Sequence, residues 1–303
     1  MNIGYLYLFI FSAIVSIRPL LVKKYSKYTF LSMLSFTISY VVGGMVLHYY
    51  KHRNFQDKDI RSLSFKELHV GFIKLADIFL FVYGASIVPA YMMVSMIALR
   101  IVFISLFDKF MNNTEYNWIS YIKIFGIMIS IVLINSNTFF GKHKKSINLY
   151  GVLSMCISVI TYSYVFTISR RYEIEKKNIS KTMIYLGKGG IPFLCLYALL
   201  YISLGKRVII PPLSIILTII GIGLLIYFVT GYAILKGLPL MPQIESAIFI
   251  NISMILSFFI STWYFKEKMS FVQIIGIILM ICIIIFSVFG KKILEYLENS
   301  KKK

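Results

Sequence analysis

Acidic residues are scarce in this chain of 303 residues, which has 12 Asp and Glu against 32 Lys and Arg. Only 15% of the residues are charged and 58% are hydrophobic, whereas about a quarter of the residues in a soluble domain are charged. Apolar runs of about 20 residues, each long enough to cross a hydrocarbon core, recur along the whole chain. The composition therefore excludes an ordinary soluble domain and predicts an all-α integral membrane protein.

Catalytic and metal-binding motifs are also missing. The three cysteines lie in apolar runs without C-x-x-C spacing, and the four histidines lack the spacing of metal ligands. The chain has no P-loop, no G-x-S-x-G and no H-E-x-x-H motif. We therefore expect no enzyme activity, no cofactor and no metal site. The net charge of +20 lies mostly in short loops between apolar runs, which is a pattern of membrane orientation, so we expect no nucleic-acid partner.

Ten apolar segments predict ten transmembrane helices, and no loop between them is long enough to hold a soluble domain. The segments are 3–22, 30–50, 69–87, 89–107, 119–137, 149–168, 182–204, 212–235, 240–264 and 271–290. Loops on one side carry more Lys and Arg, and with an even number of spans this places both the N- and the C-terminus in the cytosol. The expected partners are the lipid bilayer and a small-molecule substrate, and the formation of a homodimer stays open.

The two halves of the chain share residues at matching positions. The matching pairs are Gly4 with Gly151, 147 positions apart, and Pro89 with Pro239 and Gly126 with Gly276, each 150 positions apart. Because a repeat of five helices is odd in number, its second copy enters the membrane upside down. We predict two inverted five-helix repeats, residues 1–140 and 141–290, followed by a basic cytosolic tail at 291–303. Coincidence among Gly and Pro at helix ends is the alternative.

One stretch of the second half has a distinctive order. It begins at the Leu238-Pro239 corner, passes an acidic turn at Glu267 and reaches Gly276 in the last helix. This order resembles the end of an EamA-like repeat, found in the drug/metabolite transporter superfamily, to which nucleotide-sugar transporters are related. Pro89 and Gly126 fit the same pattern in the first half. The resemblance covers essentially the whole chain and implies a transporter fold more than a particular substrate.

A second resemblance concerns the substrate. Leu99-Arg100-Ile101 looks like the L-K-I motif of nucleotide-sugar transporters, in which the basic residue faces the substrate phosphate. Those transporters also have an asparagine-rich motif in the seventh helix, and here Gly187-Lys188-Gly189-Gly190 occupies that region instead. This departure argues against nucleotide-sugar specificity.

Charged residues inside apolar segments are candidates for a substrate site, because a charge in hydrocarbon costs several kcal/mol. Arg100, near the middle of its segment, can hold a phosphate or carboxylate bidentately. A structural pair with Asp77 is the alternative for Arg100. Lys74 is a further basic candidate, and Tyr91 is an aromatic candidate for the wall of the same site.

Two acidic residues, Asp77 and Glu245, are candidate coupling groups for a proton or a cation. Lys74 and Asp77 are three positions apart on one helix face, so a self-neutralising pair is the alternative for both. Lys188 is a fourth substrate-binding candidate if its Gly-rich segment unwinds, and otherwise it reaches the membrane surface. We expect Arg18, just before a proline in the outer part of the first helix, to reach the surface as well.

These features predict a secondary transporter that moves a small organic metabolite by alternating access. The excess of basic over acidic residues inside the membrane favours an anionic or phosphorylated solute. A proton-coupled exporter of amino acids or drugs is one alternative, and flux that depends on pH would favour it. A non-transporting membrane scaffold is another, and it predicts no cavity between the two halves.

Overall fold

The computed structural model describes residues 3–52, 65–88, 93, 96–134, 136, 148–176, 178–204, 211–265 and 270–301. Within these ranges every regular element is helical and no strand occurs. The first half contains α1 (Ile3–Val15), α2 (Arg18–Tyr25), η1 (Ser26–Tyr28), α3 (Thr29–His52), α5 (Phe65–Ile87), α7 (Arg100–Asn112) and α8 (Trp118–Ile134). The second half contains α10 (Leu149–Lys176), α11 (Ile179–Ser203), α12 (Leu213–Gly237), η2 (Leu238–Leu240), α13 (Gln243–Ile250), α14 (Ile252–Phe265) and α15 (Phe271–Lys301).

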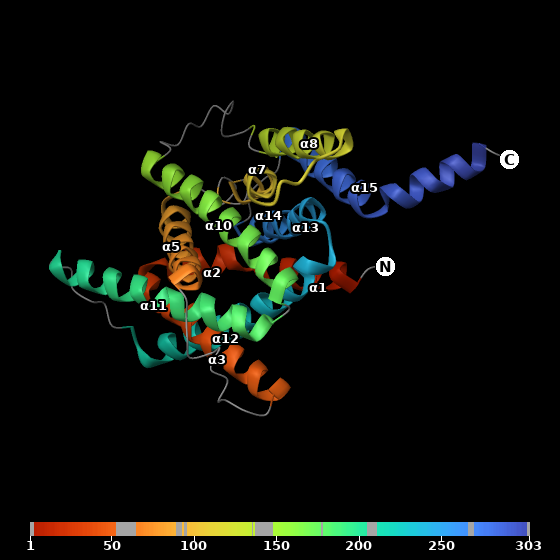
Figure 1. Cartoon of the computed structure of the whole chain (residues 1–303). Helices are drawn as coiled ribbons and strands as arrows, with labels where there is room; N and C mark the ends of the chain where they lie inside the picture. The colour runs from red at the N-terminus through yellow and green to blue at the C-terminus, as the bar shows by residue number, and fades with distance from the viewer. Residues whose placement is uncertain are drawn as a thin grey trace.

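Six helical segments in the described part of the chain are long and apolar enough to cross a membrane. They are Thr29–His52, Leu68–Ile87, Leu149–Glu175, Ile179–Ser203, Leu213–Leu240 and Gln243–Ile260. Three shorter apolar helices accompany them, at Ile3–Val15, Trp118–Ile134 and Phe271–Ser287. The all-α class is thus confirmed. The predicted tail is helical as far as Lys301, because α15 continues through it and projects away from the other helices (Figure 1).

The first predicted span, 3–22, is divided in two. Helix α1 ends at Val15, and α2 begins at Arg18 after a turn at Ser16 and Ile17. Pro19 explains the break, because it has no N–H to donate to the carbonyl of Val15 four residues earlier. The chain therefore changes direction immediately before Arg18.

Two later spans have a turn at corresponding places. In the span predicted at 89–107 the turn is at Leu99, just before α7, and in the span at 240–264 it is at Asn251, between α13 and α14. The N–H of Leu99 donates to the carbonyl of Met96 at 3.1 Å, and the N–H of Asn251 donates to that of Ile248 at 3.1 Å. Both bonds reach back three residues, which tightens the helix locally. The two turns are 152 positions apart.

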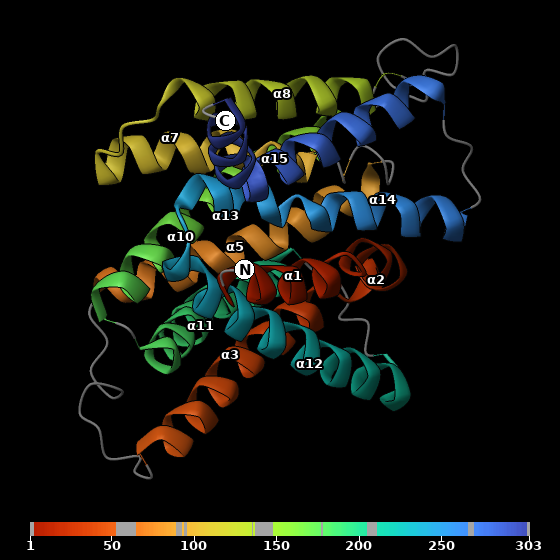
Figure 2. The ribbon, with the colours of Figure 1, turned by 90° about the vertical axis from the view of Figure 1, so that its right-hand side faces the viewer.

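The same pattern of helix contacts occurs twice in the bundle. Helix α5 packs against α10 and α11, and α12 packs against α1 and α3 (Figure 1). Gly151 at the start of α10 faces Ile87 at the end of α5, where an added Cβ would lie 2.7 Å from Ile87 Cγ1. Gly4 at the start of α1 likewise faces Leu240 and Met241 just after α12. Helices α8 and α15 pair with each other on one side of the bundle (Figure 2).

Helix α11 runs unbroken through its glycine-rich segment and through Pro192. Gly187 packs against α3, where an added Cβ would lie 2.7 Å from Val41 Cγ2. Gly71 of α5 packs against α11, and its Cβ would lie 2.6 Å from the Cα of Gly189. The missing side chains let three helices approach closely. The segment is therefore a packing surface and not an unwound stretch.

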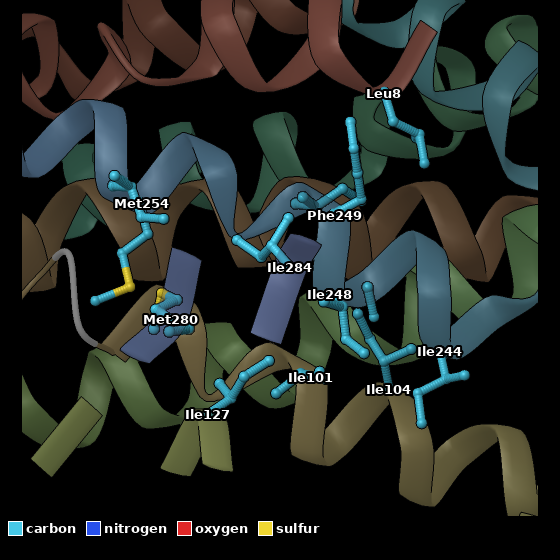
Figure 3. Close-up of a cluster of buried hydrophobic side chains, with 14 of the residues drawn as sticks. Leu8, Ile101, Ile104, Ile127, Ile244, Ile248, Phe249, Met254, Met280 and Ile284 are labelled. Carbon is cyan, nitrogen blue, oxygen red and sulfur yellow. The ribbon is translucent and has the colours of Figure 1, made fainter. Parts of the chain in front are cut away.

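Buried apolar side chains form two clusters. One lies among α1, α7, α8 and α13 to α15 (Figure 3) and includes Leu8, Ile101, Ile127, Ile248 and Met280. The other lies among α3, α5, α10 and α11 and includes Met33, Phe36, Leu75, Phe81 and Met183. Helix α10 contributes Tyr162 and Phe166 to the first cluster and Val165 and Ile168 to the second. Helix α10 therefore lies at the boundary between the two clusters.

Candidate functional site

A cavity of about 70 Å³ lies at the boundary between the two apolar clusters, and we call it the central cavity. Its wall contains Arg18 of α2, Phe36 and Tyr40 of α3, Lys74 and Ile78 of α5, Arg100 of α7, Tyr162 and Phe166 of α10, and Tyr227 of α12. The wall thus joins helices from both halves of the chain. Three of these side chains are basic, and most of the others are aromatic or aliphatic.

Arg100 is the first residue of α7, directly after the turn at Leu99, and 5% of it is exposed. Its guanidinium carbon lies 3.7 Å from the ring centre of Tyr162, within the range of a cation–π interaction. Its Nε and Nη2 atoms are buried and have no hydrogen-bond partner among the described residues. No ion pair joins Arg100 to Asp77 among the described residues, and Asp77 is bonded to Lys74 and Ser158.

Asp77 is fully buried and is held by two other side chains. The ammonium of Lys74 lies 2.9 Å from Asp77 Oδ2, and the hydroxyl of Ser158 donates to Asp77 Oδ1 at 2.6 Å. Lys74 and Asp77 thus form the pair that their spacing on α5 predicts. Lys74 also lies over the ring of Tyr162, with its Nζ 4.4 Å from the ring centre.

Arg18 differs from its predicted place at the membrane surface. Its guanidinium carbon lies 4.5 Å from the ring centre of Phe81 and 5.9 Å from that of Tyr227. Its Nε and Nη2 atoms are buried without a hydrogen-bond partner in the described part of the chain. The turn before α2 directs this side chain into the bundle. Pro19 was the available signal in the sequence, because a proline there ends the preceding helix.

Two other predicted site residues, Lys188 and Glu245, do not line this cavity. Lys188 of α11 is absent from its wall, and Tyr91 lies outside the described residues. Glu245, in the first turn of α13, accepts a hydrogen bond from the Tyr5 hydroxyl at 3.2 Å. The structure thus brings Arg100, Lys74 and Asp77 together, adds Arg18, and places Glu245 elsewhere.

Glu245 lines a second cavity, of about 470 Å³, which we call the polar cavity. Its wall includes Asp108, Tyr116, Lys123, Arg170 and Glu245. The hydroxyl of Tyr116, in the connection between α7 and α8, donates to Asp108 Oδ2 at 2.8 Å. Burial, together with this hydrogen bond, raises the pKa of Tyr116 above its ordinary value. Tyr116 therefore stays neutral and keeps its proton for Asp108.

Arg170 of α10 is bonded to residues that line each of the two cavities. Its Nη2 donates to the carbonyl of Met241 at 2.9 Å and its Nε to that of Leu238 at 3.2 Å. Its Nη1 donates to Gln243 Oε1 at 3.4 Å. Leu238 lines the central cavity, whereas Arg170 and Gln243 line the polar cavity. These three bonds fasten the end of α10 to the corner between α12 and α13, and we call them the Arg170 clasp.

Residues 149–289 match the model of the EamA-like transporter family. This part of the chain is therefore similar to the EamA-like transporter family. The match begins at the first residue of α10 and includes the apolar part of α15, so it covers the predicted second repeat. The family consists of multi-pass membrane proteins that transport small molecules, and the resemblance seen in the sequence is confirmed.

A crystal structure of another protein resembles this EamA-like chain, with a TM-score of 0.72. The two sequences are 16% identical, and the likeness covers 96% of this chain and 98% of that chain. At this identity the likeness shows the fold alone. It extends over the first half of the chain as well as the half that matches the family. No curated protein matches the chain.

Proposed function

We propose that this protein is a secondary transporter that moves a small organic anion across a membrane by alternating access. The observation that carries the proposal is the convergence of Arg18, Lys74 and Arg100 on one buried cavity. These residues come from three helices, and no short segment of the sequence contains all of them. A site of this kind, enclosed between helices of both halves, is typical of secondary transporters.

Repeated packing supports ten spans arranged as two inverted five-helix repeats. The contacts of α5 with α10 and α11 correspond to those of α12 with α1 and α3. The turns at Leu99 and Asn251 and the glycines at the starts of α1 and α10 correspond in the same way. With ten spans, the larger number of basic residues in the loops on one side favours cytosolic termini.

The charges around the central cavity support an anionic substrate. Asp77 compensates Lys74 at 2.9 Å, whereas Arg18 and Arg100 form no ion pair among the described residues. A buried cation without a counter-charge is costly in a medium of low dielectric constant. A bound anion supplies the missing counter-charge, and the rings of Phe81 and Tyr162 hold the guanidinium groups in place meanwhile.

The size of the cavity supports a transport cycle with a conformational change. Its volume of about 70 Å³ is well below the roughly 300 to 1,000 Å³ of pockets that hold drug-sized ligands. An organic solute therefore requires the helices to separate. The Arg170 clasp holds Leu238 of the cavity wall, and a further cavity of about 60 Å³ shares Arg18 and Tyr227 with the central one. Because the chain has no P-loop, exchange or an ion gradient would supply the energy.

Two alternatives receive less support. A proton-coupled exporter needs an acid that is free to titrate, but Asp77 is held by Lys74 and Ser158, and Glu245 is in the other cavity. A scaffold without transport activity does not require a charged cavity between its halves. Uptake that follows a pH gradient, without any need for an anion, would favour the exporter.

Transport by purified protein in proteoliposomes tests the proposal. A thermal-shift screen against nucleotides, sugar phosphates, dicarboxylates and amino acids first selects a ligand for radiolabelled uptake. We expect Arg100→Ala to abolish uptake and to leave the thermal midpoint of the protein unchanged or higher. Arg171→Gln is the matched control, because Arg171 is exposed and pairs with Glu175 on its own helix. Wild-type uptake by Arg100→Ala would remove Arg100 from the site.

A further inference from the structure

The two cavity arginines leave the same edge of their side chains without partners. In both Arg18 and Arg100 the buried atoms that lack a hydrogen-bond partner, among the described residues, are Nε and Nη2. The N–H bonds of these two atoms point in nearly the same direction. This edge of a guanidinium holds two oxygens of one carboxylate or phosphate, which gives a bidentate and charge-assisted contact.

The two guanidinium groups are close enough to share one small ligand. Both lie near the ring of Phe81, with guanidinium carbons 4.5 Å (Arg18) and 6.0 Å (Arg100) from its centre, so the two carbons are at most 10.5 Å apart. Charge-assisted hydrogen bonds of about 2.8 Å on each side leave a gap that a small molecule can bridge. The hydroxyl of Tyr162 lacks a partner among the described residues as well and is a further donor in the wall.

Charge compensation then sets the valence of the ligand. Lys74 is compensated by Asp77, so two positive charges remain in the wall. A monoanion compensates one of them and leaves the other guanidinium buried and unpaired, which is the costly arrangement. A neutral solute compensates neither. The count therefore selects a ligand with two negative charges.

We propose that the central cavity binds a small dianion that bridges Arg18 and Arg100, each through its Nε and Nη2 edge. This inference rests on the proposed function and narrows its substrate class. A dicarboxylate offers one carboxylate to each arginine. A phosphate monoester offers pairs of oxygens on a single phosphorus atom. Both satisfy the same chemistry, and the experiment distinguishes them.

Binding to the purified full-length protein in nanodiscs tests the valence directly. Succinate and succinamate form a matched pair that differs by one charge, and glycerol 3-phosphate, inorganic phosphate and sulfate at pH 8 are the other dianions. We expect at least one dianion to bind about tenfold or more tightly than succinamate, because its second charge adds charge-assisted hydrogen bonds to the second arginine. Tighter binding of succinate indicates a dicarboxylate site, and tighter binding of glycerol 3-phosphate indicates a phosphate site. If no dianion binds more tightly than succinamate, the proposal is overturned.

Variants link the valence to the two arginines. Arg18→Gln and Arg100→Gln each remove one charged edge, so we expect each to reduce the preference for the dianion to about twofold or less. Arg171→Gln, which changes an exposed arginine, should keep the wild-type preference. A full preference in either cavity variant would contradict the bridging arrangement.

Uptake measured in parallel separates this inference from the proposed function. Binding of a dianion without any flux would support the site and contradict transport. Flux of a monoanionic or neutral solute, with no preference for dianions, would support transport and overturn the dianion site.

Discussion

The ammonium of Lys74 lies 2.9 Å from the carboxylate of Asp77, one turn along the same helix. Ser158 of α10 donates to the second oxygen of that carboxylate at 2.6 Å. These bonds satisfy the acid on two sides and compensate the lysine. The cations that remain without a carboxylate partner in the described part of the cavity wall are therefore the two arginines, Arg18 and Arg100. This division of roles explains why the ligand proposed for a cavity with three basic residues carries two negative charges.

The Lys74–Asp77 pair makes a prediction about stability. Asp77→Asn should lower the free energy of unfolding by about 3–5 kcal/mol, because it leaves a buried ammonium without its counter-charge. The double variant Lys74→Met/Asp77→Asn removes both charges and should recover most of that loss. Thermal or denaturant unfolding in detergent measures both effects. Equal losses in the single and the double variant would show that the unpaired ammonium of Lys74 does not cause the loss.

Tyr162 makes a prediction about the aromatic wall. Its ring lies against Arg100 at 3.7 Å and against Lys74 at 4.4 Å, and a desolvated cation–π interaction contributes about 2 kcal/mol. Tyr162→Leu should therefore raise the KM for uptake about tenfold or more. Tyr162→Phe keeps the ring and should retain more of the uptake than Tyr162→Leu. Equal uptake by the two variants would show that the ring does not position the cations.

The Arg170 clasp makes a prediction about access to the central cavity. Arg170→Met keeps much of the apolar stem and removes three hydrogen bonds to the corner between α12 and α13. The corner should open more often, so a membrane-impermeant maleimide should label Ser169→Cys about tenfold faster, as expected for the loss of about 1.5 kcal/mol. Ser169 is a suitable reporter because it is buried and lines the central cavity.

This labelling requires a background without the three native cysteines, Cys156, Cys195 and Cys282. Arg171→Met is the control, since Arg171 is the next residue and is exposed. If Ser169→Cys is labelled at the same rate with Arg170→Met, with Arg171→Met and with neither substitution, the clasp does not limit access.

The packing around two glycines predicts opposite effects of an alanine substitution. The two glycines, Gly71 and Gly221, occupy matched positions 150 residues apart. An added Cβ at Gly71 would lie 2.6 Å from the Cα of Gly189, whereas a Cβ at Gly221 meets nothing within 4 Å. Gly71→Ala should lower the free energy of unfolding by about 1–3 kcal/mol. Gly221→Ala should be neutral or stabilising by up to about 1 kcal/mol, because alanine is the better helix former. A thermal midpoint for Gly71→Ala at or above that of Gly221→Ala would contradict close packing of α5 and α11.

The sequence alone predicted the class of the protein, the positions of most helices and the family. These depend on local properties, because the length and hydropathy of a segment decide whether it can cross a bilayer. It also offered the Lys74–Asp77 pair as the alternative to separate roles for the two residues, since three positions on one helix fix which side chains are neighbours. The prediction for Lys188 depended on an unwound segment, and α11 is instead continuous there.

Arg18 shows where reasoning from local sequence ends. Its segment indicated a residue near the membrane surface, and the chain places it over Phe81, 63 positions later in the sequence. The turn before α2 decides the direction of the side chain, and the packing of α2 against α5 decides what it meets. Hydropathy and spacing determined that the chain spans a membrane with basic residues inside it. Only the tertiary structure decided which of those residues share a cavity, because that depends on contacts between helices distant in the sequence.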